Sequence, residues 1–396
     1  MTGAAACGGT VLRFLTAGES HGPALVVTVE GLPAGLPILI DDVADELARR
    51  RLGYGRGPRM RFERDEVEFL GGVRHGRTLG SPLAILIRNS EWATGKWAEE
   101  MSSAPGHTSA PLTKPRPGHA DLAGMQKYGF DDARDVLERA SARETAARVA
   151  AGSVAKALLA HVDVAVLSHV IQLGAATASG GRRPTVDDLA QVDASEVRCF
   201  DPDSESDMIR EIKEAAKAGD SLGGVVEVLG YGVPPGLGSH VHWDRRIDGL
   251  LAQALMSIQA MKAVEIGDGF TVAGLPGSEA HDAISWDAER RAYRRESTRA
   301  GGIEGGMTTG DLLVARVAMK PLATLNRPVL KTVDVESKVE TLSFKERTDV
   351  TAVPAAGVVA ETMVALVLAA EALRKFGGDS LTEFVRNHDA YLASLT

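Results

Sequence analysis

The sequence predicts an α+β protein, specifically an internally duplicated β-α-β sandwich with helices packed between antiparallel sheets. A strand followed by a Gly-Pro turn occurs twice, at residues 26–36 and 225–237. Each copy leads into a helix that leaves through a glycine-rich turn, at 53–57 and at 267–269. The segment 354–376 is apolar on almost every side, which is typical of a helix buried between layers.

A second explanation of the repeat stays open. The later copy matches the earlier one only with a short insertion, and the chain contains 43 glycines. Strand, Gly-Pro turn and helix can recur by chance in such a chain. Either way, the local patterns define the individual elements.

In the first half, alternating and β-branched residues predict strands at Ala24–Glu30 and Leu83–Arg88. Asp41 and Asp42 supply the chemistry of a helix start, and Val43 and Leu47 fall on one face of that helix. A longer helix is expected over roughly 136–161.

In the second half, strands are expected at 162–173, Gly224–Leu229 and Leu312–Met319. Apolar residues from Ile247 to Ile258 recur at helical spacing, and Asp244 or Asp248 would begin that helix. The apolar helix 354–376 should end at Gly377.

Composition describes a soluble globular protein. The 396 residues are 44% hydrophobic and 24% charged, with a net charge of −9. An acidic chain is poorly suited to bind nucleic acid or an anionic membrane non-specifically, so neither is expected as a partner. Cys7 and Cys199 are too far apart to suggest a disulfide framework, and residues 1–10 are expected to be a disordered extension rather than a secretion signal.

One segment departs from this acidity. Seven arginines lie between Arg49 and Arg64 against a single acid, Glu63. Guanidinium groups pair bidentately with phosphate and carboxylate, so the segment predicts an anionic substrate, held by Arg50, Arg56 and Arg59. A solvated helix end would also explain 49–51, because cations suit a helix C-terminus, but it does not explain the later arginines.

Two histidines lie in glycine-containing turns. His21 follows Gly18-Glu19-Ser20, and His119 follows a Pro-Arg-Pro-Gly turn with Lys114 and Arg116 beside it. A histidine can donate a proton near neutral pH, and neighbouring cations suit a phosphate pocket. Most single histidines are nonetheless structural.

Three further segments have two interpretations each. The charged run 138–148 suits a catalytic segment or ordinary intrahelical ion pairs. The run 301–307 is too glycine-dense for a regular element, and is either a cradle for a phosphate or flavin or a flexible surface loop. Arg347 and Asp349 precede the buried helix, where such a pair is usually structural. The absence of a dinucleotide-binding or phosphate-loop motif argues against a Rossmann enzyme and a kinase.

Taken in order, these segments resemble the chorismate synthase family from about Leu12 to about Leu392. The regions 18–22, 139–145 and 347–354 look like the family's three signatures, and 49–57, 116–121 and Lys320-Pro321 also agree. The resemblance implies one domain over 11–396. It also implies a homotetramer, while the lack of a secretion signal and of a membrane-length apolar stretch predicts a cytoplasmic protein.

The resemblance also implies a reaction. Phosphate and a ring proton leave 5-enolpyruvylshikimate 3-phosphate by trans-1,4 elimination, with reduced FMN required but not consumed. One of His21 and His119 would protonate the departing phosphate and the other the flavin. Asp349 would assist flavin N5 in accepting the substrate proton, with Ser20 and Ser141 in support. NADPH would serve only as a reductant of the flavin.

By the same resemblance, two sets of residues bind the ligands. Substrate anions would be held by Arg50, Arg56, Arg59, Arg116 and Arg143. The flavin would contact Arg139, Ala140, Ser141, Gln259, Ala260, Gly305, Lys320, Pro321, Leu322, Ala323, Thr324 and Arg347. Two positions depart from the family pattern: Thr298 replaces a usual asparagine and Ala323 replaces an often polar residue.

Two alternatives would give different behaviour. A polyanion-binding protein would use the arginine segment to bind RNA in a salt-sensitive way without flavin, although the acidity of the chain opposes it. A conventional flavin oxidoreductase would transfer a hydride to a second substrate and leave the flavin oxidised.

Overall fold

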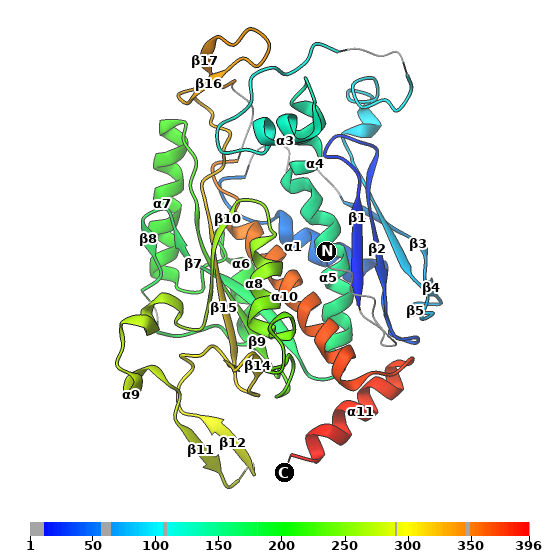
Figure 1. Ribbon diagram of the computed structural model, residues 1–396, viewed down its shortest axis with the longest axis vertical. Coiled ribbons are helices and arrows are strands. Elements are labelled where there is room, and N and C mark those ends of the chain that lie inside the picture. The colour runs from blue at the N-terminus through cyan, green and yellow to red at the C-terminus, as the bar shows by residue number, and fades with distance from the viewer. Residues whose placement is uncertain are drawn as a thin grey trace.

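The computed structural model describes residues 12–56, 65–105, 109–179, 181–289, 291–344 and 349–395. The expected N-terminal extension, 1–10, lies outside these ranges. Two antiparallel sheets enclose a layer of helices, and a mixed α+β fold with antiparallel sheets is therefore confirmed (Figure 1).

The first sheet has four strands in the order β1-β2-β6-β3. Their bounds are Arg13–Ala17, Ala24–Glu30, Leu83–Arg88 and Glu66–Gly71. Strand β2 alternates as predicted, because Leu25, Val27 and Val29 are buried while the residues between them are partly exposed. The short strands β4 (Val73–Arg74) and β5 (Arg77–Thr78) form a hairpin at one end.

The second sheet has five strands in the order β10-β15-β9-β7-β8. Their bounds are Met261–Ile266, Leu313–Met319, Gly224–Tyr231, Ala165–Leu173 and Ala176–Thr177. Strand β7 begins three residues later than the expected 162, because the chain first turns through Asp163, which has φ +56°. A second hairpin, β13 (Ile303–Glu304) with β14 (Met307–Thr308), lies beside this sheet.

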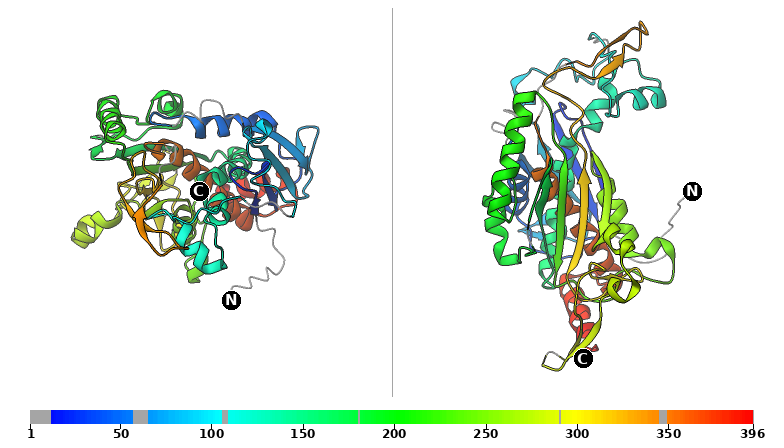
Figure 2. Two further views of the ribbon diagram at one scale, coloured as in Figure 1. Left: turned by 90° about the horizontal axis from the view of Figure 1, so that it is seen from above. Right: turned by 90° about the vertical axis from the view of Figure 1, so that its left-hand side faces the viewer.

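Four helices lie between the sheets: α1 (Ile40–Arg51), α5 (Thr145–Ala160), α8 (Ile247–Met256) and α10 (Val353–Phe376). Helices α1 and α5 contact strands β3 and β2 of the first sheet, while α8 and α10 contact β10, β7 and β9 of the second. Figure 2 (right) looks onto the face of the second sheet, behind which the helices and the first sheet lie.

The remaining elements lie at the ends and edges of this sandwich. They are α3 (Asp121–Tyr128), α4 (Arg134–Ala140), α6 (Leu189–Ala194), α7 (Pro202–Ala218), α9 (Gly277–Ala280), α11 (Leu381–Ala393), β11 (Ile284–Asp287), β12 (Ala292–Arg295), β16 (Lys331–Val333) and β17 (Glu340–Leu342). Helix α3 and strands β16 and β17 gather at one end, and β11, β12 and α11 at the other (Figure 1).

Helix α10 is the core of the molecule. It is long and apolar enough to cross a membrane, but 89% of its most apolar window is buried inside the protein. It ends at Gly377, which has φ +63°, as the sequence predicted. The helix is therefore apolar on all sides because protein surrounds it.

Helices α5 and α10 approach closely at Gly152. A Cβ atom on this glycine would lie 2.1 Å from Cβ of Thr362, a distance that real side chains do not adopt. The absence of a side chain on Gly152 thus lets the two central helices meet.

The expected helix over 136–161 is wrong in one respect: it is interrupted. Helix α4 ends at Ala140, Ser141 is extended at φ −61° and ψ 141°, and α5 starts at Thr145 after one 3-10 turn. The Ser141 hydroxyl accepts the N–H of Arg143 at 3.2 Å and caps that turn. The apolar spacing continues across the break, which is why the sequence pattern did not indicate it.

Candidate active site

Several predicted residues gather at one end of the sandwich. Helix α1 ends there, and α5 and α10 both begin there, with 16 and 24 residues respectively. The N-terminus of a helix carries a partial positive charge and unpaired N–H groups. The electrostatic potential of these helix ends therefore favours the binding of an anion at this end of the molecule.

Three arginines surround one carboxylate at this end. Arg143 pairs with Asp65 at 2.5 Å, while Arg50 and Arg51 lie 3.8 and 4.0 Å from the other oxygen of the same carboxylate. Arg50 is 4% exposed and Arg143 7% exposed. The interpretation of 49–51 as a solvated helix end is wrong, because these side chains turn into the protein. These arginines lie beside the start of α5, where Arg50 donates to Thr145 at 3.3 Å, so guanidinium groups and a helix N-terminus meet in one place that favours an anion.

Glycines bring Arg56 to the start of α10. Gly53 and Gly55 have φ +121° and +82°, and a Cβ on Gly53 would lie 2.9 Å from Pro354. The carbonyl of Gly55 accepts the N–H of Val350 at 2.8 Å. Arg56 consequently forms an ion pair with Asp349 at 3.1 Å. Arg59 and Arg347 lie outside the described residues, so their predicted contacts stay predictions.

His21 is held on two sides. Its Nδ1 lies 2.8 Å from Oε1 of Glu138, and its ring stacks on Trp97 with centroids 4.0 Å apart. Burial alone would raise the pKa of Glu138, but the interactions with His21 and Arg134 outweigh it and lower the pKa. Glu138 is therefore a carboxylate in contact with a histidine rather than a member of a purely intrahelical ion pair.

The two predicted serines meet beside this histidine. The hydroxyl groups of Ser20 and Ser141 are 3.1 Å apart although 121 positions separate them in the chain. The backbone N–H of Ser20 donates to the carbonyl of Glu138 at 3.0 Å. The break at Ser141 thus lets its hydroxyl meet that of Ser20, the residue before His21.

His119 has a carboxylate partner of its own. Its Nδ1 contacts Asp121, which is fully buried and also accepts from Nε of Arg116 at 2.8 Å. Burial would raise the pKa of Asp121, but the hydrogen bonds from His119 and Arg116 hold it well below its usual range. Arg116 also donates to Thr324 at 3.1 Å, which brings two sets of predicted residues together.

The predicted flavin residues form two contacting groups. Arg139 donates to the carbonyls of Thr16 and Gly18 at 2.9 and 3.0 Å, and Gln259 donates to Glu144, which accepts from Thr16. Ala140 ends helix α4 beside Arg139.

Ala260 belongs to the other group. It has φ +67°, unusual for a residue with a side chain, and its carbonyl accepts the N–H of Lys320 at 3.0 Å. Burial lowers the pKa of Lys320, and the charge of Lys262 lowers it further. Pro321, Leu322 and Ala323 continue the chain to Thr324, and a Cβ on Gly118 would lie 3.9 Å from Ala323.

A cavity of about 510 Å³ opens next to Glu138. Its lining carries five carboxylates and one arginine: Glu19, Glu100, Asp132, Asp135, Glu138 and Arg134. Such a lining repels anions, so we place the anion site on the arginine side of His21 rather than here.

Gly305 lies apart from the other predicted residues within this chain. It forms the turn of the β13-β14 hairpin with Gly306, and both have the positive φ that a two-residue hairpin turn requires. Gly306 packs on Arg246 just before α8, whereas Gln259 follows the far end of that helix. Ten helical residues span about 15 Å. The prediction that 301–307 is too glycine-dense for a regular element is wrong, because the glycines build this hairpin.

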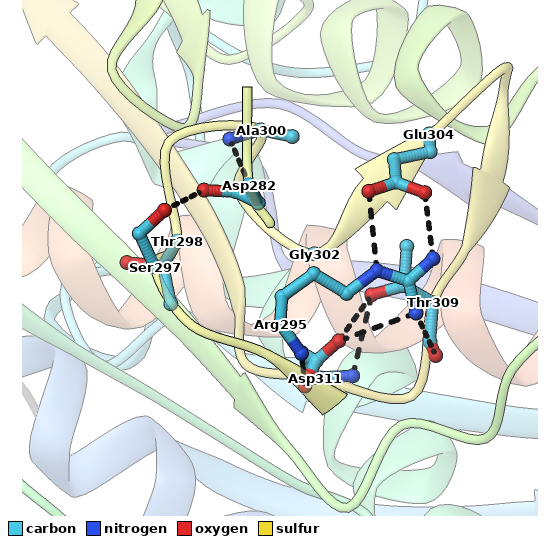
Figure 3. A pocket seen from close by; sticks show the side chains of 9 residues that line it. All are labelled: Asp282, Arg295, Ser297, Thr298, Ala300, Gly302, Glu304, Thr309 and Asp311. Carbon is cyan, nitrogen blue, oxygen red and sulfur yellow. Dashed lines mark hydrogen bonds and ion pairs between the residues drawn. The ribbon is translucent and has the colours of Figure 1, made fainter. Parts of the chain in front are cut away.

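A polar cluster fixes the loop before this hairpin (Figure 3). Arg295 pairs with Glu304 at 2.6 Å, and Asp282 accepts the N–H of Ala300 at 2.9 Å. Thr298 lines the same cluster and accepts from Arg183 at 3.0 Å. The side chains fill the space between them, so the cluster stabilises the loop and leaves no room for a ligand.

Comparisons with known proteins agree with one another. A model of the chorismate synthase family matches residues 12–373. Chorismate synthase of Streptomyces coelicolor is 61% identical over 393 residues, which cover 97% of this chain and 98% of that protein. Chorismate synthase of Thermobifida fusca is 58% identical over 395 residues, 97% of this chain and 99% of that protein. A crystal structure of chorismate synthase, 40% identical, matches with a TM-score of 0.78 over 98% of this chain and 99% of that chain.

Fold and site together describe an enzyme that acts on a small molecule, with cationic side chains and two histidines at one end of an α+β sandwich. The comparisons identify this class of enzyme as a lyase of the shikimate pathway. The chain belongs to the chorismate synthase family.

Two carboxylates of this site were missed as site residues by sequence reasoning. Asp65 meets Arg143 across 78 positions and Glu138 meets His21 across 117. The only local signal was that Asp65 directly follows the arginine segment and that Glu138 belongs to the charged run before Ser141.

Proposed function

We propose that this lyase removes phosphate and a ring proton from 5-enolpyruvylshikimate 3-phosphate to give chorismate, with reduced FMN bound but not consumed. Family membership supports the reaction. The observation that carries the site assignment is the meeting of Arg50, Arg51 and Arg143 at Asp65, beside the start of α5.

The substrate anions are held by Arg50, Arg143, Arg56 and Arg116. Guanidinium groups bind phosphate and carboxylate with paired hydrogen bonds, and the starts of α5 and α10 add partial positive charge. The buried position of Arg50 and Arg143 strengthens their attraction for an anion, because little water screens them.

The residues also fit reduced FMN, a ring with a phosphate tail. Lys320 and Arg139 supply cations, and the break at Ser141 and the irregular segment 320–324 interrupt regular structure on either side. Oε1 of Gln259 is buried and has no hydrogen-bond partner among the residues that the structure describes, so it is suited to accept a donor from a ligand. The departures at Thr298 and Ala323 do not remove any of these groups.

When bound, reduced FMN lends electron density to the substrate during the elimination. The carbon-oxygen bond to phosphate breaks, a ring proton leaves, and a new double bond forms, so no net oxidation occurs. His21 and His119 hold the protons that this step requires, and each is oriented by a buried carboxylate. Asp349, paired with Arg56, assists removal of the ring proton, and the hydroxyls of Ser20 and Ser141 orient His21.

An anaerobic assay with chemically reduced FMN tests this function. We expect the protein to release chorismate and phosphate in equal amounts while the flavin spectrum stays reduced, and His21→Ala, His119→Ala and Asp349→Ala to lose activity by about 10²- to 10⁴-fold. A folded, flavin-bound wild type that forms neither product contradicts the proposal, and flavin oxidised in step with turnover favours an oxidoreductase.

We also propose that the two halves are duplicates within one domain, 11–396. The strand order β1-β2-β6-β3 corresponds to β7-β9-β15-β10, and α1 and α5 correspond to α8 and α10. Thr78 donates to the carbonyl of Pro33 at 2.6 Å, as Thr308 does to that of Pro234. When the two repeated sequence segments are aligned on these two contacts, the short insertion assumed from the sequence is not needed.

The assembly is proposed to be a cytoplasmic homotetramer. Gly305 would then contribute to flavin binding only at the site of another chain, because it lies away from the other flavin residues of its own. Sedimentation analysis of the purified protein measures the assembly directly.

A further inference from the structure

We propose that Glu138 is a positioning residue, which holds the Nδ1 proton of His21 and so assigns Nε2 as the atom through which this histidine exchanges protons. The inference deepens the proposed function and rests on it for the role of His21. The arrangement of Glu138 itself does not depend on the reaction.

Glu138 forms hydrogen bonds with both the backbone and the ring of His21. Its Oε2 accepts the backbone N–H of His21 at 2.9 Å, and its Oε1 lies 2.8 Å from Nδ1. The residue is 3% exposed. Since the carboxylate is held ionised, it can only accept, and Nδ1 must therefore carry the hydrogen.

Other contacts fix the remaining freedom of the ring. Trp97 stacks on the ring of His21. The residue before His21, Ser20, donates its backbone N–H to the carbonyl of Glu138. Arg134 approaches Oε1 of Glu138 at 3.4 Å but also pairs with Glu100 at 2.7 Å. Glu138 thus gives most of its accepting capacity to His21.

The pair at His119 is built differently. Asp121 accepts from the backbone and side chain of Arg116 at 3.0 and 2.8 Å as well as from His119. Its negative charge is therefore shared with a guanidinium, whereas that of Glu138 is directed mainly to His21. Substituting Asp121 would disturb a proposed substrate arginine, so Glu138 gives the cleaner test.

The substitution Glu138→Gln makes a specific prediction. The backbone N–H of His21 can only donate, so the amide oxygen of glutamine must face it. The amide NH₂ then faces Nδ1, which must become an acceptor. The neutral ring is expected to change from the Nδ1–H to the Nε2–H tautomer, and kcat to fall by about 10²- to 10⁴-fold with a smaller change in KM.

Magic-angle-spinning NMR of the full-length protein labelled with ¹⁵N-histidine measures the tautomer directly. The His21 signals are assigned by their loss in His21→Gln. We expect neutral His21 to carry its hydrogen on Nδ1 in wild type and in Glu138→Asp, and on Nε2 in Glu138→Gln. The matched control is Glu91→Gln, whose carboxylate lies 3.9 Å from Nε2 and should leave the tautomer unchanged.

An Nε2–H tautomer in wild type overturns the inference, even if Glu138→Gln fails to fold. An unchanged tautomer in folded Glu138→Gln overturns it as well. Neither measurement needs turnover, so a wild type that makes no chorismate would contradict the proposed function without affecting this result.

Discussion

Two neighbouring residues of helix α1 belong to two very different ionic clusters. Arg49 joins a cluster of three cations and three carboxylates, which we call the balanced cluster: Arg49, Lys156, Arg198, Glu46, Asp193 and Glu361. Arg50 joins the site cluster, in which Arg50, Arg51 and Arg143 approach the carboxylate of Asp65. Both lie largely inside the protein, but the first is centred on Glu361 within α10, whereas the second lies beside the start of α5.

The balanced cluster is centred on Glu361 in the middle of α10. Glu361 is fully buried and lies 2.8 Å from both Arg49 and Arg198, and 3.1 Å from Lys156. Burial would raise the pKa of Glu361, but these cations hold it well below its usual range. Matched charges with good hydrogen bonds stabilise a fold, whereas arginines beside the N-terminus of a helix are placed to bind an anion. The comparison separates structural from ligand-binding arginines.

The largest effect is expected from Glu361→Ala. Removing one partner of a buried ionic group leaves the guanidinium of Arg198 without its buried partner, which typically costs about 3 to 5 kcal/mol. Urea unfolding followed by circular dichroism measures this loss. Asp207→Ala, which removes an exposed pair with Arg210, is the control and should change little. Equal effects of the two variants would show that the balanced cluster is not structural.

A reciprocal outcome is expected for two substitutions one residue apart. Arg50→Met should lower kcat/KM by about 10²-fold with little loss of stability, because it removes a proposed substrate cation while Arg51 and Arg143 still pair with Asp65. Arg49→Met should instead lower stability. Steady-state kinetics and urea unfolding on both variants decide the matter. The comparison breaks if Arg49→Met impairs substrate binding while Arg50→Met mainly destabilises the fold.

A smaller effect is expected from Glu227→Gln, in a third cluster on the second sheet. His169, Arg183 and Arg316 lie 3.2, 2.9 and 2.9 Å from this carboxylate, and the interactions outweigh burial to lower the pKa of Glu227 from 4.5 to about 2. A depressed carboxylate pKa stabilises the fold above pH 4.5, and this contribution is lost as the pH falls toward 2.

Wild type should therefore be more stable than Glu227→Gln by about 2 kcal/mol at pH 7, and the difference should shrink below pH 4.5. Urea unfolding at several pH values measures the difference. A constant difference between pH 7 and pH 3 would contradict the ionic explanation.

Local patterns predicted the elements that depend on local chemistry. Strands β2 and β6 were predicted with the bounds observed, because alternation and β-branched residues are properties of the segment itself. Helix α10 was predicted from its uniform apolarity and ended at Gly377. Ser141 was not recognised as a break, because the helical spacing continues through it and its conformation depends on contacts with distant residues.

The site was predicted as a set of residue types rather than as an arrangement. Arginine and histidine in glycine-containing turns indicated His21 and Arg50, but nothing local distinguished Arg50 from Arg49. Their difference arises from partners more than 90 positions away, Thr145 for one and Glu361 for the other. Sequence spacing contains no information about such partners.

The glycine at the crossing of α5 and α10 has a consequence for how the site can change. Gly152 lies near the middle of α5, and a methyl group there would occupy the place of Thr362. A single added carbon would wedge the two central helices apart and so change the spacing of their first residues, which lie near Arg50 and Asp349. The spacing of the helices at the catalytic end thus depends on Gly152 having no side chain. Substitutions in the loops around the site are therefore tolerated more readily than a substitution at this one position.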